Sequence, residues 1–294
     1  MRFENSVIHT LDHRNPGEHP VIIQTYEKAR KILDGDAINP RDFVDLYGEN
    51  NVAHDLRYVE SRKLKFENDE IKRASDVLEA ILYQHTELSG WFGPNAETFR
   101  PSEYDDIKNG IDLIVEFNSD NFSKHLALGV DITFSTLSMG KKFERIKKEI
   151  ESDKLALVKY FESHGFKGAL KHVPRVVIGL EKDTVISLAA LWMRNQNAEL
   201  GNHFAQDILM REILEQLKTF KTYAESIDSA KAVRSYSQSI GILATALRER
   251  NTDNQQKERQ RVHHNEIMDD RVYRDIQSQL EAFKPASKTT KSLL

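Results

Sequence analysis

The chain has 294 residues, of which 39% are apolar and 30% are charged, and its formal net charge is -4. This length and composition allow a buried core, while the acidic balance excludes a general basic coat for nucleic acid, so nucleic-acid contacts must come from local patches. The absence of cysteine excludes disulfides and thiolate metal sites. Because no run approaches the ~18 apolar residues of a membrane span, we expect a cytoplasmic protein without a membrane partner.

The first 68 residues predict a mostly helical N-terminal region. Residues 19–33, "HPVIIQTYEKARKIL", predict a short strand or turn that leads into a helix, and the apolar spacing over residues 41–66 indicates two more helical faces. Residues 69–88 carry an apolar stripe at helical spacing and predict a long amphipathic helix. Glycine and proline then break the chain at residues 90–94, and residues 95–106 predict a loop or a short irregular strand.

The middle of the chain predicts a mixed sheet. Apolar runs at residues 111–117 and 126–134, separated by the turn sequence "NSDNFSKH", predict a hairpin. Residues 140–165 predict a helix with a stop at Gly165, because its apolar stripe runs through Leu157 and Phe161. Residues 174–181, "PRVVIGLE", predict a buried strand that lies parallel to a neighbour across this helical crossover.

The last third of the chain predicts helices. Asp183 would cap a helix over residues 184–195, and residues 203–220 predict an amphipathic helix. The tail from about residue 221 is helical but polar, with a thin apolar stripe at Ile267, Val272 and Ile276, so it should protrude, be poorly ordered or pair in a homo-oligomer. The element order predicts an α/β fold, with a mixed central sheet flanked by helices over residues 69–221 and helical extensions at 1–68 and 222–294.

Two aspartates stand inside the apolar runs of the predicted hairpin. Asp112 heads the first run and Asp131 lies between Val130 and Ile132 in the second. A buried carboxylate is costly unless it is paired or holds a metal, and strand alternation would let the two carboxylates converge on one face. Ligands that are all oxygen favour Mg²⁺ or Mn²⁺. Asp112 could instead be a turn or cap residue, and Asp131 could face water on an edge strand.

The hairpin sequence resembles a known enzyme superfamily. "GIDLIV", a turn, then "GVDIT" and a basic helix are similar to the PD-(D/E)XK nucleases, over roughly residues 69–220. The resemblance implies a restriction-endonuclease-like core and metal-dependent hydrolysis of phosphodiester bonds in DNA or RNA. It implies Asp112 and Asp131 as metal ligands, with Glu79 as the glutamate that the preceding helix often supplies.

The chain departs from the family pattern at the lysine position, where Thr133 stands. Lys141 or Lys142, at the start of the next helix, would replace that lysine, and Thr133 would position a water. Without the lysine the same fold could be a catalytically inactive nucleic-acid-binding or protein-assembly module, which is the alternative function.

A second departure concerns the helix glutamate. Glu79 falls just beyond the edge of the apolar stripe, so a helical wheel does not aim it at the sheet. Asp76 and Glu70 are weaker substitutes, and Asp105 and Asp106 could add ligands or form a solvated acidic turn.

Other residues carry two interpretations each. A basic cluster follows the second aspartate strand and could contact phosphates or form a solvated helix face between interleaved glutamates. Its members are Lys141, Lys142, Arg145, Lys147 and Lys148. Trp91, next to Phe92, could stack on a base or anchor a loop in the core. His263 and His264 are adjacent, which is the wrong spacing for two ligands on one helix face.

Overall fold

The structure is a computed structural model that describes residues 19–63, 70–119, 122–131, 136–250 and 269–284. The N-terminal region is helical, with α2 at Pro20–Gly35, the 3₁₀ helix η2 at Pro40–Phe43, α3 at Val44–Tyr47 and α4 at Glu49–Lys63. The start that was predicted as a strand or turn is helical from Pro20 onward, because proline fits the first helical turn and the His19 ring accepts a hydrogen bond from the N–H of Val21. The long predicted helix is α5, Glu70–Leu88.

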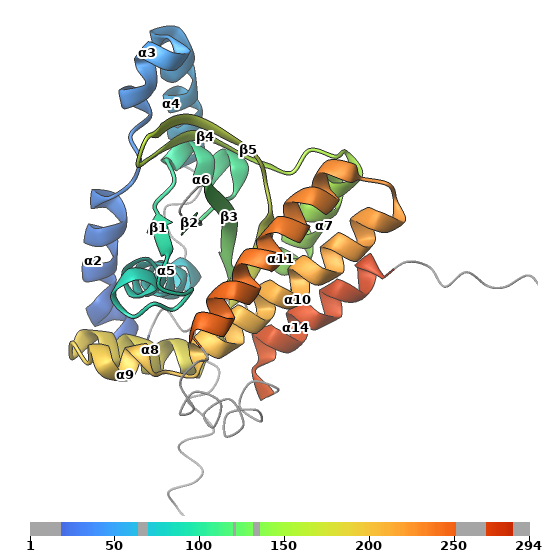
Figure 1. Ribbon diagram of the computed structural model, residues 1–294. Coiled ribbons are helices and arrows are strands. Elements are labelled where there is room, and N and C mark those ends of the chain that lie inside the picture. The colour runs from blue at the N-terminus through green and yellow to red at the C-terminus, as the bar shows by residue number, and fades with distance from the viewer. Residues whose placement is uncertain (1–18, 64–69, 120–121, 132–135, 251–268, 285–294) are drawn as a thin grey trace, which may run out of the picture.

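A four-stranded mixed sheet forms the centre of the molecule (Figure 1). Its order is β1 (Ala96–Phe99), β2 (Leu113–Ser119), β3 (Phe122–Asp131) and β6 (Arg175–Gly179). The predicted hairpin is present as the antiparallel β2–β3 pair, and it is tighter than predicted because Ser119 already pairs with Phe122. The predicted parallel strand is also present, since β6 runs parallel to β3 after the crossover helix α7, Thr136–Glu151.

The helix predicted over residues 140–165 is wrong in its second half. α7 ends at Glu151, and β4 (Ala156–Ser163) and β5 (Phe166–Val173) form a two-stranded antiparallel sheet. The chain leaves the helix at Asp153, which takes a left-handed conformation with φ of 52°. Val158 and Tyr160 are buried while Leu157 is exposed. This alternation is that of a strand and not of the predicted helical stripe.

The segment predicted as a loop or irregular strand contains β1 and a helix, α6, at Glu103–Asn109. Ser102 caps α6, since its hydroxyl accepts from the N–H of Asp105, and Gly110 ends the helix in the left-handed conformation. A serine before the helix and a glycine after it are ordinary helix signals, so the sequence does contain the information that predicts α6.

The C-terminal helices are α8 (Lys182–Met193), α9 (Asn197–Gly201), α10 (Ala205–Ser226), α11 (Ala230–Arg250) and α14 (Arg271–Leu280), followed by the 3₁₀ helix η3 (Glu281–Phe283). Asp183 does not cap α8, because the helix begins at Lys182 after Glu181. The prediction of a protruding tail is wrong for α11 and α14, which lie beside α10 and bury Tyr236 and Ile276 (Figure 1). Ile267, His263 and His264 lie outside the described residues, and a homo-oligomer stays a prediction.

Each face of the central sheet is covered differently. Leu113 and Val115 belong to the main hydrophobic core, which includes residues from Ile22 in α2 to Phe283 in η3. Ile114 faces the other side and packs with β4 and β5 in a second cluster. The described part of the chain contains no helix with the length and apolar character needed to cross a bilayer.

Candidate functional site

Arg100 joins the candidate helix glutamate to the first candidate aspartate. Glu79 lies on α5 and is 9% exposed, and its Oε2 is 3.1 Å from Nη1 of Arg100, which directly follows β1. The same Nη1 donates a hydrogen bond of 2.7 Å to the backbone carbonyl of Asp112. Glu79 is therefore near the start of β2, although its place on the helical wheel did not indicate it.

Lys142 supplies a positive charge at Asp112. Its Nζ lies 4.0 Å from Oδ2 of Asp112, and its side chain is 36% exposed. Lys141, the other predicted substitute for the family lysine, is exposed on the neighbouring helical position. Of the two lysines, Lys142 is the one that the fold brings to the aspartate.

The register of the β2–β3 pair places positions 112 and 131 at the same end of the hairpin. Leu113 pairs with Leu128, Asp112 directly precedes β2, and Asp131 is the last residue of β3. Counting along this register, positions 112 and 131 lie at the same end of the hairpin and on the same face of it. The side chain of Asp131 and all of Thr133 lie outside the part of the chain that the structure describes.

We define the acidic cluster as Asp76, Glu79, Asp106 and Asp112. Burial, and then the negative charge of Asp112, raise the pKa of Glu79 well above its ordinary value, although the charge of Arg100 lowers it. The same two causes raise the pKa of Asp106 to about 7. Burial also raises the pKa of Asp76, whose carboxylate lies 3.3 Å from Arg30. Carboxyl groups in this state are stabilised by a proton or by a cation.

The donor chemistry of the acidic cluster fits a hard divalent ion such as Mg²⁺ or Mn²⁺, because every candidate ligand is a carboxylate oxygen. Among the residues that the structure describes, no three acidic or histidine side chains are grouped closely enough to hold an ion. Asp112 and Glu79 would therefore need the side chain of Asp131 to complete a ligand set.

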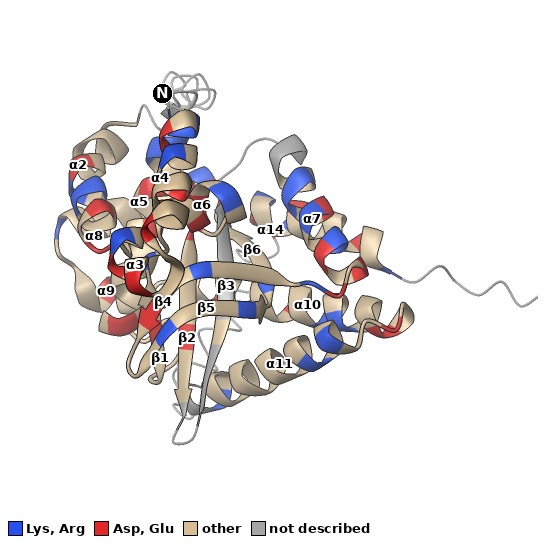
Figure 2. Ribbon diagram, turned by 90° about the horizontal axis from the view of Figure 1, so that it is seen from above, with Lys and Arg blue, Asp and Glu red and all other residues tan. Residues whose placement is uncertain are grey.

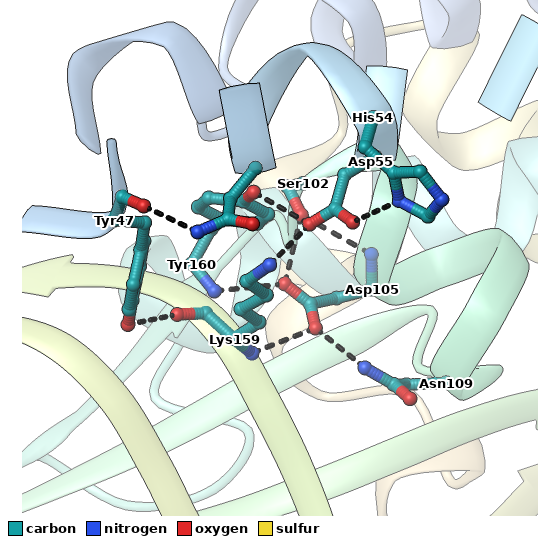
Figure 3. A network of polar contacts seen from close by, with 9 residues as sticks. Tyr47, His54, Asp55, Ser102, Asp105, Asn109, Lys159 and Tyr160 are labelled. Atoms are coloured by element: carbon teal, nitrogen blue, oxygen red, sulfur yellow. Dashed lines mark hydrogen bonds and ion pairs between the residues drawn. The ribbon is translucent and has the colours of Figure 1, made fainter. Parts of the chain in front are cut away.

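Asp105 is a structural residue, and the prediction that it belongs to a solvated acidic turn is wrong. Its side chain is fully buried and accepts the N–H groups of Lys159, at 2.7 Å, and Tyr160, at 3.0 Å (Figure 3). It also accepts hydrogen bonds from Ser102 and Asn109. These contacts occupy both carboxylate oxygens and attach β4 to α6, so Asp105 is not a metal ligand.

A second buried carboxylate attaches the N-terminal helices to β4. Asp55 of α4 contacts the ammonium group of Lys159 and accepts a 2.7 Å hydrogen bond from the Tyr160 hydroxyl (Figure 3). From α3, Tyr47 donates a hydrogen bond of 2.8 Å to the backbone carbonyl of Lys159. Because all these groups bind one another within the fold, the network accounts for the docking of α3 and α4.

The predicted basic cluster is divided between two uses. Arg145 donates to the carbonyl of Lys108 and pairs with Glu149, and Lys147 donates to the carbonyl of Ala282, so these two side chains bind the protein itself. Lysine and arginine alternate with glutamate along α7 (Figure 2). Arg145 and Lys147 are therefore used within the fold, and a phosphate contact through Lys141, Lys142 and Lys148 stays a prediction.

Trp91 anchors a loop in the core, and its interpretation as a base-stacking residue is wrong. Its side chain is fully buried, and the indole N–H donates a 3.2 Å hydrogen bond to the carbonyl of Leu200. Phe92 beside it is buried as well. A ring with no exposed surface cannot stack on a nucleotide base.

Sequence reasoning missed Arg100 as a member of the site, whereas Asp106 was already a candidate ligand. Comparison of the chain with protein-family models, with curated proteins and with solved structures finds no match to any of them. The function must therefore be argued from the geometry of the site and the chemistry of its residues.

Proposed function

We propose that the protein is a metal-dependent nuclease that hydrolyses phosphodiester bonds in DNA or RNA. The observation that carries this proposal is the meeting of Glu79, Asp112 and Lys142, from three different elements, at the end of the hairpin that also holds position 131. Two or three acids with one adjacent lysine are the residue types that the resemblance to the PD-(D/E)XK nucleases implies for metal-assisted hydrolysis.

The order of the elements supports a PD-(D/E)XK-like, restriction-endonuclease-like core. A helix, α5, precedes three antiparallel strands, and the crossover helix α7 leads to a parallel strand, β6. The resemblance found in the sequence implies a helix, a strand hairpin, a helix and a further strand, with an acid on each strand of the hairpin, and α5, β2–β3, α7 and β6 follow that order. The two-stranded β4–β5 sheet is then an insertion between the crossover helix and the last strand.

The roles of the residues follow from their positions. Asp112 and Asp131 would hold Mg²⁺ or Mn²⁺, with Glu79 as a third acid. When bound, such an ion polarises a phosphoryl oxygen and lowers the pKa of a water molecule. Lys142 would place its ammonium group beside the scissile phosphate, in place of the lysine that Thr133 replaces, and Thr133 would orient a water.

A second candidate function is a catalytically inactive nucleic-acid-binding or protein-assembly module. The observation in its favour is Arg100, whose guanidinium group already pairs with Glu79 and lies at the backbone of Asp112. An internal cation at this place offsets part of the negative charge that a metal ion would otherwise neutralise.

The test is cleavage of labelled single-stranded and double-stranded DNA and RNA with Mn²⁺ or Mg²⁺, together with calorimetric titration of Mn²⁺. We expect cleavage that EDTA, Asp112→Asn and Asp131→Asn each abolish. Glu162→Gln is the matched control, because Glu162 is an exposed strand carboxylate paired with Lys167 outside the acidic cluster. A folded protein that neither cleaves any substrate nor binds Mn²⁺ would favour the inactive module.

A further inference from the structure

Three arginines hold alternate carbonyl groups of the segment that leads to Asp112. Arg145 Nη2 donates to the carbonyl of Lys108 at 3.1 Å. Arg175 Nη1 donates to the carbonyl of Gly110 at 2.6 Å, and Arg100 Nη1 donates to the carbonyl of Asp112 at 2.7 Å. The three side chains come from α7, from the start of β6 and from the residue after β1.

We propose that Arg100, Arg145 and Arg175 are positioning residues that fix Asp112 for metal binding through the backbone of residues 108–112. This inference rests on the proposed function, because it assigns Asp112 a ligand role. It extends the site beyond the carboxylates to the groups that hold them, and none of these arginines was singled out for this role by the sequence.

The geometry favours positioning because Arg175 is itself held rigidly. Arg175 is 4% exposed, and its other two nitrogens donate to Glu149 at 3.1 and 3.3 Å. A guanidinium group presents its donors in a fixed plane, so a group that is fixed by Glu149 on one side also fixes the carbonyl of Gly110 on the other.

Gly110 makes the close approach of these arginines feasible. It has a left-handed φ of 59°, and a Cβ atom there would lie 2.8 Å from Nη1 of Arg145 and 3.9 Å from Nη1 of Arg175. Any other residue at this position would strain the backbone and push Arg145 away. The conformation of Gly110 thus allows Arg145 of α7 and Arg175 of β6 to bind the same segment.

Arg100 couples the position of Asp112 to that of Glu79, since one nitrogen contacts both residues. A shift of the segment would change the separation of two candidate ligands that come from different elements. Groups that orient metal ligands without touching the metal typically change metal affinity on the order of 10–100-fold when they are replaced.

The experiment uses the full chain with Arg145→Gln, Arg145→Lys and Arg175→Lys. The side chain of Arg145 is 41% exposed, so we expect its replacement to disturb the fold less than that of Arg175, which is 4% exposed. Lys154→Gln is the matched control, because it removes an exposed positive charge just after α7 without touching residues 108–112. Amide hydrogen exchange of the metal-free protein and calorimetric Mn²⁺ affinity are measured for each variant.

We expect amide exchange over residues 110–114 to accelerate about tenfold or more in Arg145→Gln and Arg175→Lys, and Mn²⁺ affinity to fall on the order of 10–100-fold. Arg145→Lys should recover part of the affinity, and Lys154→Gln should match the wild type. Cleavage should lose kcat while KM stays constant, because the change acts on the ligands and not on substrate contacts.

Two failures are distinguishable. Unchanged exchange and unchanged Mn²⁺ affinity in both arginine variants would overturn the positioning role while leaving the nuclease proposal intact. A wild-type protein that neither binds Mn²⁺ nor cleaves would remove the metal site and, with it, the assignment of Asp112 as a positioned ligand. If the arginine variants of such a protein still showed accelerated exchange, the three arginines would have a structural role only.

Discussion

The pKa of Asp106 is raised to about 7, first because the half-buried carboxyl group is desolvated and then because the negative charge of Asp112 is near. The ordinary value is 3.8. Between these two values the folded protein binds one proton more than the unfolded chain, so this carboxyl group makes the protein less stable as the pH rises toward 7.

We predict that Asp106→Asn removes this dependence. Without metal, the variant should be more stable than the wild type at pH 8, and this gain should be smaller at pH 5, where the carboxyl is ionised in the unfolded chain but still neutral in the folded protein. Urea unfolding at the two pH values measures the difference. An equal gain or loss of stability at both values would contradict the assigned titration.

Glu212 is a buried carboxyl group that caps the edge of the central sheet. Its Oε2 accepts the N–H of Gly179 at 3.0 Å, and Oε1 has no hydrogen-bond partner among the described residues. One turn further along α10, Gln216 binds both the N–H and the carbonyl of Val177. Burial raises the pKa of Glu212 well above its ordinary value, which favours the neutral form of the group beside β6.

Because burial favours the neutral form of Glu212, Glu212→Gln should keep the hydrogen bond from Gly179 and be at least as stable as the wild type at pH 7, whereas Glu212→Ala should cost about 1–3 kcal/mol relative to the glutamine variant by leaving the Gly179 N–H unpaired. The raised pKa also means that the wild type loses stability as the pH rises above 4.5, and the glutamine variant should not. Denaturant unfolding across pH measures both effects. A glutamine variant as unstable as the alanine variant would show that the carboxyl group is charged.

At the scale of elements, the docking of α3 and α4 depends on one buried polar network. Burial alone would raise the pKa of Asp55, but hydrogen bonds from Lys159 and Tyr160 outweigh that effect and lower it. The stabilisation that this carboxylate supplies is therefore complete at neutral pH and is lost as the pH falls below about 4. Hydrophobic contacts of Phe43 and Val52 with Tyr160 complete the interface.

Asp55→Ala should destabilise the protein by about 3 kcal/mol at pH 7, because it leaves the ammonium group of Lys159 without its buried partner. Amide exchange should accelerate in α4 and β4 more than in α10. Tyr160→Phe removes one hydrogen bond of the network and should cost only about 1 kcal/mol. Equal costs for the two variants would show that the ion pair contributes nothing beyond a hydrogen bond.

The elements that were predicted correctly are those with a local signal. α5 and α10 have long apolar stripes, and the β2–β3 hairpin has two apolar runs around a turn sequence. β4 was mistaken for helix because Phe143, Ile146, Ile150, Leu157 and Phe161 happen to keep a helical spacing across the real helix end. The left-handed residue Asp153, which ends α7, also binds Ser229 and the N-terminus of α11, so a distant contact fixes that boundary.

At the scale of the whole molecule, the C-terminal segment completes the main core. Phe283 of η3 is 1% exposed and lies against Phe220 of α10, with 4.8 Å between ring centroids, and against Phe143 of α7, at 6.2 Å. The polar sequence of the tail hid this role, although α14 and η3 carry a buried face in the described part of the chain. Residues near the end of the chain thus hold the crossover helix that bears Lys142.

Phe283→Ala should cost about 3–5 kcal/mol in the free energy of unfolding, because it removes a buried aromatic ring and leaves a cavity. Thermal and denaturant unfolding measure the loss. Leu88→Ala is the control, since Leu88 is 69% exposed, and it should change stability by no more than about 0.5 kcal/mol. A loss below about 1 kcal/mol for Phe283→Ala would contradict the buried position of this ring and support the prediction of a protruding tail.

The sequence by itself determined the α/β class, the central hairpin, the parallel strand and the candidates Asp112, Asp131, Glu79 and Lys142, because apolar periodicity and turn residues act over short stretches of chain. Only the tertiary structure decided which of these candidates meet. Arg100 entered the site, and Trp91 and Asp105 left it, through contacts between residues that are far apart along the chain. Burial and neighbouring charge then set the pKa values, and no local pattern encodes either of them.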